Sequence, residues 1–150
     1  MAKSGANRLA FATWLMFFRD HGRFPRGPSD LESLDIAALA RQIKVPIPAD
    51  GAWLIAERTA KRLRTEIRAR CGFREATVAD AQMLTVWLRD HVAGEAAGQI
   101  EPLIERLESR CRELAIEPPT ADRVERIART ALRACRRARK PDLTHSRCSY

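Results

Sequence analysis

Apolar residues recur every three or four positions along most of this chain, which is the spacing of one face of an α-helix. Pro, Gly, Ser and Asp residues interrupt the pattern and mark the ends of the periodic segments. No stretch alternates strictly between apolar and polar residues, so the pattern predicts no β-strand. The periodic segments predict six helices, over residues 7–21, 31–44, 53 or 57 to 70, 77–93, 100–115 and 121–139.

The start of the fourth predicted helix carries the clearest local signal. Thr77 and Asp80 have the spacing of a capping box, with Asp in place of the usual Glu. Val78, Leu84 and Leu88 then fall among the apolar positions of this helix. Across the whole chain, the residues expected in the core are Trp14, Phe18, Trp53, Leu63, Ile67, Trp87 and Leu88.

The composition strengthens the helical prediction. Ala, Leu, Arg and Glu are frequent, whereas the β-branched and aromatic residues that favour strands are sparse. We therefore expect an all-α fold of five to six helices, in one or two helix-turn-helix-like bundles. A helical domain is expected over residues 1–140, divisible into sub-units at 1–50 and 51–140, and a disordered tail over 141–150.

The charge balance indicates a polyanionic partner. Twenty-seven Lys and Arg residues oppose 19 Asp and Glu residues, which gives a net charge of +8. Most of these cations are arginines, which bind phosphates and guanine edges in a bidentate manner. A solvated surface in a chain with a general arginine bias explains the same balance equally well. Charge alone therefore suggests nucleic acid without establishing it.

Residues that catalyse reactions or hold metals do not form recognisable motifs. His21 and His91 each follow an Asp at the end of a predicted helix, where a histidine interacts favourably with the helix dipole. His145 and Cys148 lie close in sequence, but no second pair has the spacing of a zinc site. We therefore expect no enzyme active site, no metal, no cofactor and no small-molecule substrate.

Two predicted helices carry most of the basic residues. In the helix that ends at residue 70, Lys61, Arg64 and Arg68 have the spacing of one helix face, although neighbouring glutamates also allow ordinary ion pairs. The last helix has no acidic residue after Glu125 through Lys140, so phosphates would relieve its self-repulsion. The predicted DNA-contacting residues are Arg58, Lys61, Arg62, Arg64, Arg68 and Arg74, with a second set of Arg129, Arg133, Arg136 and Arg137.

Several segments, taken in order, resemble the N-terminal domain of Tn-three family transposases, the large enzymes of replicative class II transposons. The most specific is an Arg-Thr followed by a basic helix and then by Ile-Arg, three residues and Gly-Phe-Arg. Together the similar segments span about residues 7–139. They are residues 7–12, 19–25, 57–76, 87–88, 110–119 and 122–127.

The resemblance implies a helical domain that binds double-stranded DNA at the terminal inverted repeats of a transposon. The family's catalytic carboxylates belong to a longer C-terminal part, to which no segment of this chain is similar, so no catalysis is expected. We expect a bacterial cytoplasmic protein that joins the nucleoid when it binds DNA, with no membrane partner. The alternative is a helical protein-interaction or regulatory fragment that modulates a full-length transposase by pairing through the apolar side of its last helix.

Overall fold

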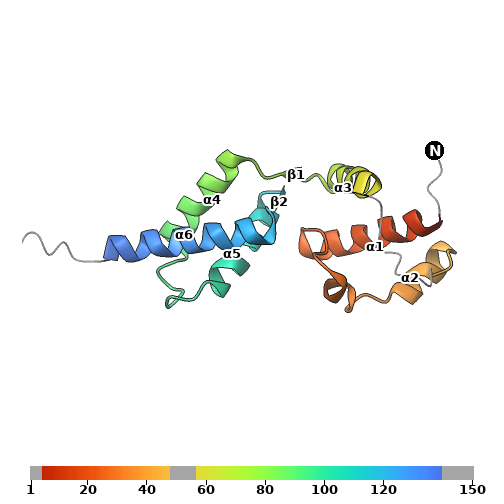
Figure 1. The fold of residues 1–150 in the computed structure, drawn as a ribbon, viewed down its shortest axis with the longest axis horizontal. Coiled ribbons are helices and arrows are strands. Elements are labelled where there is room, and N and C mark those ends of the chain that lie inside the picture. The colour runs from red at the N-terminus through yellow and green to blue at the C-terminus, as the bar shows by residue number, and fades with distance from the viewer. Residues whose placement is uncertain (1–4, 48–56, 140–150) are drawn as a thin grey trace, which may run out of the picture. The chain divides into compact units, whose positions relative to one another are not determined.

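The computed structural model of the chain describes residues 5–47 and 57–139. Six α-helices make up most of these residues, so the predicted all-α fold is confirmed. The expected tail over residues 141–150 and the expected core residue Trp53 lie outside the described part. The elements, labelled as in Figure 1, are α1 (Gly5–His21), the 3₁₀ helix η1 (Pro28–Leu31), α2 (Ile36–Ile43), α3 (Glu57–Cys71), β1 (Arg74–Glu75), α4 (Val78–His91), α5 (Glu101–Glu113), β2 (Ile116–Glu117) and α6 (Ala121–Arg139).

The chain forms two compact units. The first contains residues 1–75 and 112–117, and the second contains residues 76–111 and 118–150. The predicted division near residue 50 falls within residues 48–56, outside the described part of the chain, and stays a prediction. Among the described residues, no helix is long and apolar enough to cross a membrane.

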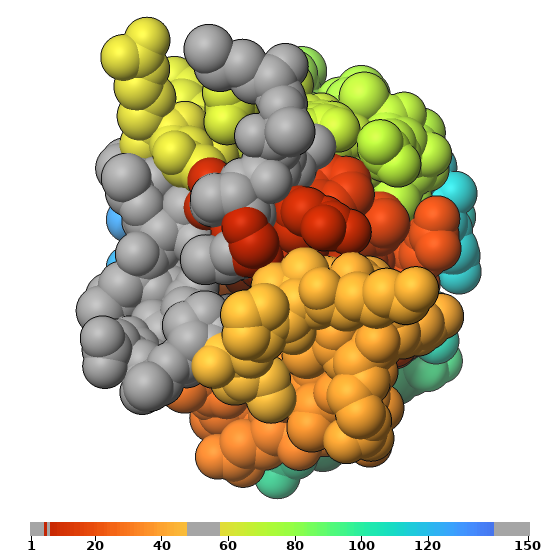
Figure 2. Space-filling view, turned by 90° about the vertical axis from the view of Figure 1, so that its right-hand side faces the viewer, coloured from red at the N-terminus to blue at the C-terminus, as the bar shows by residue number. Residues whose placement is uncertain are grey.

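The first unit is built around α1, which packs against a different partner near each end. Near its start, Leu9 packs against Leu39 of α2, and near its other end Phe18 packs against Phe24 and against Ile67 of α3. Figure 1 shows both helices beside α1, and Figure 2 shows residues 28–47 in orange against the red residues of α1. The two clusters hold α2 and α3 on the same central helix.

The second predicted helix is shorter than expected. The pattern predicted residues 31–44, but Leu31 belongs to the 3₁₀ turn and the α-helix begins only at Ile36. The carboxylate of Asp35 accepts a hydrogen bond from the backbone N–H of Ala38 at 2.9 Å and so caps the later start. A side chain that bonds its own backbone in this way favours a helix start at this position over a helix that continues through it.

A pair of very short parallel strands corrects the prediction that the chain has no β-strand. Arg74 is paired with Ile116, and Glu75 is paired with Glu117. The first strand, β1, follows Gly72, whose φ of 72° turns the chain at the end of α3. Two residues are too few to show an alternating pattern, so this pairing depends on tertiary contacts that periodicity does not reveal.

The second unit packs α4 against α6, and Figure 1 shows α4 running obliquely to α6. Leu84 and Leu88 are fully buried on α4. Cys135, at the end of the apolar stripe predicted for α6, is only partly buried. The other apolar residues of this stripe recur every three or four positions and are buried, as predicted. They are Val124, Ile127, Ala128, Ala131 and Leu132.

The capping box at the start of α4 is confirmed. Thr77 Oγ1 accepts a hydrogen bond from the backbone N–H of Asp80 at 3.1 Å, and Asp80 Oδ2 accepts one from the backbone N–H of Thr77 at 2.8 Å. Val78 is an apolar position of this helix, but 72% of the residue is exposed. As the first residue of the helix, Val78 lies before the turns that pack against α6.

The expected core is correct for Phe18 and the aliphatic residues, whereas the two described tryptophans lie at its edge. Trp14 and Trp87 are only half-buried. Guanidinium groups lie over both rings. That of Arg64 is 5.5 Å from the ring centroid of Trp14. Those of Arg106 and Arg110 are 5.9 and 5.2 Å from the ring centroid of Trp87. An indole is large, and a cation over its face is favourable, so neither ring needs complete burial. The confirmed core residues are Phe18, Leu63, Ile67 and Leu88.

Candidate nucleic-acid interface

The outward side of α6 presents a strongly positive surface on the second unit. Because the apolar residues of this helix are buried, the 3.6-residue period directs its arginines toward solvent. Five exposed arginines follow one another along this side. They are Arg126, Arg129, Arg133, Arg136 and Arg137, and four of them belong to the set predicted from the sequence.

Arg126 is the member that the sequence-based set omitted. It is exposed, and it lies three residues before Arg129 and seven before Arg133, which places all three on one side of the helix. The same spacing is visible in the sequence and could have identified Arg126. The outward face is therefore longer than predicted by about one turn.

Within the described part of the chain, the contacts of these arginines leave most of their positive charge without a compensating carboxylate. Arg129 forms an ion pair with Glu125 at 2.7 Å, and Glu125 is the last acidic residue of the helix. Arg136 donates to the carbonyl of Gly98 at 3.3 Å, and a backbone carbonyl orients a guanidinium without neutralising its charge. The fold thus positions this part of α6 while its electrostatic attraction for anions is retained.

A shallow hollow lies beside the arginine row, where the chain enters α5. Arg129, Arg133 and Arg136 line it together with Gly98 and Ile100. The carbonyl of Ile100 accepts the hydrogen bond from the backbone N–H of Ile104, so the first backbone N–H groups of α5 lie at this position. Arginines beside a helix start provide the donors that a phosphate group requires, although Glu101 at the rim opposes them.

The predicted contact set on α3 is divided by the structure. Arg58, Lys61 and Arg62 are exposed on the first unit. Arg64 is half-buried with its guanidinium over Trp14. The expected shared face of Lys61, Arg64 and Arg68 is therefore not equally accessible along its length.

Arg68 is engaged within the protein. Its guanidinium contacts a Glu117 carboxylate oxygen at 2.8 Å and a Glu75 carboxylate oxygen at 3.1 Å, and only 12% of its side chain is exposed. Burial raises the pKa of Glu117 above the ordinary value, and the nearby Arg68 guanidinium opposes that rise. These contacts assign Arg68 a structural role that joins α3 to the strand pair.

Arg74 is exposed on β1, next to Glu75, which pairs with Glu117 of β2. Its guanidinium donates to the carbonyl oxygen of Glu75 at 3.2 Å. The side chain therefore lies at the turn where the sequence placed it, held by a neutral acceptor.

The alternative mode of partner binding predicted from the sequence requires an accessible apolar side on the last helix. In the structure, that side of α6 is buried within the second unit, where α4 packs against it. The protein's own α4 therefore covers most of this stripe, and the interaction-module alternative stays a prediction.

Groups with other chemistry are dispersed. His21 and His91 are the last residues of α1 and α4, as predicted, and each ring lies near an aromatic residue of its own helix. Burial raises the pKa of the Cys111 thiol to about 11, which makes it a weak nucleophile near neutral pH. Within residues 5–47 and 57–139, no three His, Cys, Asp or Glu side chains are grouped so that they could hold a metal ion.

Comparison with known proteins identifies a family. No curated protein matches the chain. The model of the DUF4158 family, described as a domain of unknown function, matches residues 2–131. Because this match covers most of the 150 residues, the chain belongs to the DUF4158 family.

Proposed function

We propose that this chain is a DNA-binding module that recognises the terminal inverted repeats of a transposon and has no catalysis of its own. The observation that carries the proposal is the outward face of α6. This face keeps five exposed arginines and no acidic residue after Glu125, while the opposite side of the helix is buried. Such a helix is held by its core and can bring a row of guanidinium groups to the phosphates of a duplex.

The two units would contribute separate basic surfaces. The second unit offers the arginine row of α6, and the first offers Arg58, Lys61 and Arg62 on α3. Contacts with phosphates depend little on base sequence, so they explain affinity and its dependence on salt. The preference for transposon ends is inferred from the segments that resemble the transposase N-terminal domain, which include α3 and the start of α6.

A double substitution on α6 tests the proposal. The protein with Arg126→Ala and Arg133→Ala is compared with wild type by fluorescence anisotropy of a labelled DNA duplex across a salt series. Each phosphate contact contributes about 0.9 to the slope of log affinity against log salt, so the slope should fall by roughly 1.8 if both contacts are lost.

The matched control carries Arg19→Ala and Arg41→Ala, two exposed arginines of the first unit that lie outside both basic faces. It removes the same formal charge and should keep the wild-type slope. Equal losses in the two double variants would mean that only net charge attracts DNA. An unchanged slope in the α6 variant would remove α6 from the interface.

A further inference from the structure

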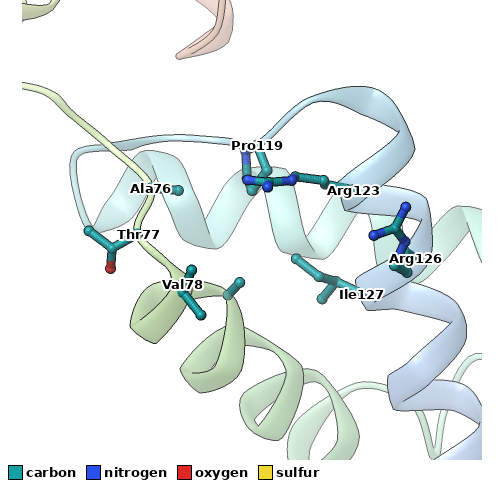
Figure 3. Close-up of a pocket in the computed structure, with 8 residues that line it drawn as sticks. Ala76, Thr77, Val78, Pro119, Arg123, Arg126 and Ile127 are labelled. Carbon is teal, nitrogen blue, oxygen red and sulfur yellow. The ribbon is translucent and has the colours of Figure 1, made fainter.

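A partly apolar hollow lies on the second unit, between the start of α4 and the first turns of α6. Figure 3 shows Val78 on α4, Ile127 on α6, and two arginines that extend from α6 at the rim. Most of the lining is apolar, in contrast to the hollow beside Gly98. The lining residues are Ala76, Thr77, Val78, Ala81, Pro119, Arg123, Arg126 and Ile127.

The exposure of Val78 is not required for folding of α4. Thr77 and Asp80 already cap the helix, and Val78 makes its first turn while 72% of it remains exposed. A β-branched apolar residue gains little there, because it has lower helix propensity than many polar residues and is not removed from water. Beside a concave apolar lining, this exposed residue marks an interaction surface.

The electrostatics of the hollow differ from those of a phosphate site. The carboxylate of Asp80 accepts hydrogen bonds from the backbone N–H and the hydroxyl of Thr77, so the start of α4 already has its own anion. A second carboxylate, Asp122, is exposed in the first turn of α6. Because most of the lining is apolar, a DNA backbone would leave this surface unused.

The two arginines at the rim favour a different partner. Arg123 and Arg126 are exposed and lie three residues apart on α6, so their guanidinium groups can bind two discrete carboxylates about one helical turn apart. An apolar side chain between those carboxylates would lie against Val78 and Ile127. Charge and shape thus match an acidic segment with an apolar anchor.

We propose that this hollow binds a short segment of a partner protein in which a bulky apolar side chain is flanked by Asp or Glu residues. The apolar side chain enters between Val78 and Ile127, and the flanking carboxylates pair with Arg123 and Arg126. Because Arg126 also belongs to the outward face of α6, this segment competes with DNA for one arginine. The site otherwise lies apart from the proposed DNA surface, since Val78 and Arg123 are outside it.

The test uses fluorescein-labelled synthetic peptides and the full chain. In one set, Leu, Ile, Phe or Met is flanked by Asp and Glu at spacings up to one helical turn. In the control sets, either the central residue is Ala or the flanking acids are Lys. Anisotropy should show saturable binding only for the acidic peptides with a bulky centre, and their addition should shift the backbone amide resonances of Ala81 and Ile127.

Two matched variants locate the site. Val78→Asp should weaken binding by about tenfold or more, because it removes the apolar contact and repels the flanking acids. Ala79→Asp adds the same charge to the same exposed first turn but lies outside the lining, so it should leave the affinity unchanged. An acidic residue in this turn suits the helix dipole, so both proteins should fold.

Several results would overturn the proposal. They are the absence of saturable binding by every acidic peptide, equal binding by the Ala-centred peptides, or equal losses in the two variants. If Val78→Asp instead abolished binding of duplex DNA and no peptide bound, the hollow would be part of a nucleic-acid surface. If peptides bound as expected while DNA did not bind at all, the proposed DNA function would fail and this site would stand.

Discussion

Replacing Arg68 with alanine should destabilise the first unit far more than replacing its partner Glu117 with glutamine. Arg68 is nearly buried on α3, and its guanidinium lies 2.8 Å from Glu117 on β2 and 3.1 Å from the more exposed Glu75. Arg68→Ala leaves the Glu117 carboxylate, which is only 20% exposed, without this cation. Glu117→Gln instead keeps an oxygen that can accept a hydrogen bond from Arg68 and removes the buried negative charge.

The expected magnitude follows from this asymmetry. Loss of one partner of a fully buried ion pair costs about 3–5 kcal/mol, and a hydrogen bond to a charged group contributes about 1.5–3 kcal/mol. Because Glu117 keeps some contact with water and can take up a proton, the expected cost of Arg68→Ala is about 2 kcal/mol at neutral pH. Glu117→Gln should cost less than about 1 kcal/mol, since the raised pKa of Glu117 means that burial outweighs the attraction of Arg68.

Urea unfolding followed by circular dichroism measures both changes. With a slope of about 2 kcal/mol per molar urea, Arg68→Ala should lower the unfolding midpoint by about 1 M. Arg62→Ala, an exposed arginine on the same helix, is the matched control and should change stability by no more than about 0.5 kcal/mol.

The pH dependence gives a second signature. A carboxyl group whose pKa is raised by folding stabilises the protein below its ordinary pKa and loses that contribution as the pH rises through the folded-state value. Without Arg68, the folded-state pKa of Glu117 should rise further. The cost of Arg68→Ala should therefore be largest at neutral pH and should shrink below the ordinary glutamate value of 4.5. Equal costs for Arg68→Ala and Arg62→Ala, or a cost that grows at acid pH, would refute this reasoning.

Three further predictions test local structure. Thr77→Ala removes the hydrogen bonds of the Thr77 hydroxyl, including the one that it accepts from the backbone N–H of Asp80, and should cost about 1 kcal/mol in urea unfolding, whereas Thr77→Ser should restore the stability. Gly22 and Gly72 both have a left-handed backbone, with φ of 70° and 72°, but a Cβ at Gly22 would also lie 3.2 Å from Cγ of Arg112. Gly22→Ala should therefore lower the melting temperature more than Gly72→Ala, and equal shifts would contradict the crowding. The Arg23 guanidinium holds the pKa of Asp30 below its ordinary value of 3.8, so Asp30 stabilises the fold above that pH and loses this contribution as the pH falls further. Asp30→Asn should flatten that acid limb of the stability curve, measured by thermal unfolding.

The sequence predicted α6 well because the signals for this helix are local and agree with one another. Its apolar residues keep a helical period from Val124 to Leu132, and Pro119 precedes its start. The boundaries at residues 121 and 139 match the prediction. The arginines of α6 point outward because this apolar stripe points inward, so periodicity alone gave most of the candidate face.

The role of Arg68 could not be predicted in this way. Its partner Glu117 is 49 residues away in sequence and is brought near by a pairing of two-residue strands, which leaves no periodic signal. Periodicity correctly placed Arg68 beside Arg64 on α3. It could not show that the guanidinium of Arg68 is already paired with a carboxylate. Long-range contacts of this kind decide which basic residues of a helix are accessible to a partner.

The hollow beside Val78 was missed for a related reason. Its apolar residues fit the general inward pattern, so the sequence gives no sign that the first turn of α4 extends past the surface that packs against α6. The hollow forms where the first turns of two helices meet in space, and the spacing of residues along one helix does not show where another helix lies.

The most direct test of the central claim compares two labelled duplexes of equal length, a transposon terminal inverted repeat and a scrambled sequence of the same composition. Binding of each to the full chain is measured by fluorescence anisotropy across a salt series. The proposed function predicts tighter binding to the repeat at every salt concentration, with an affinity that falls steeply as salt rises. Equal affinity for the two duplexes, or no binding to either, would contradict recognition of transposon ends.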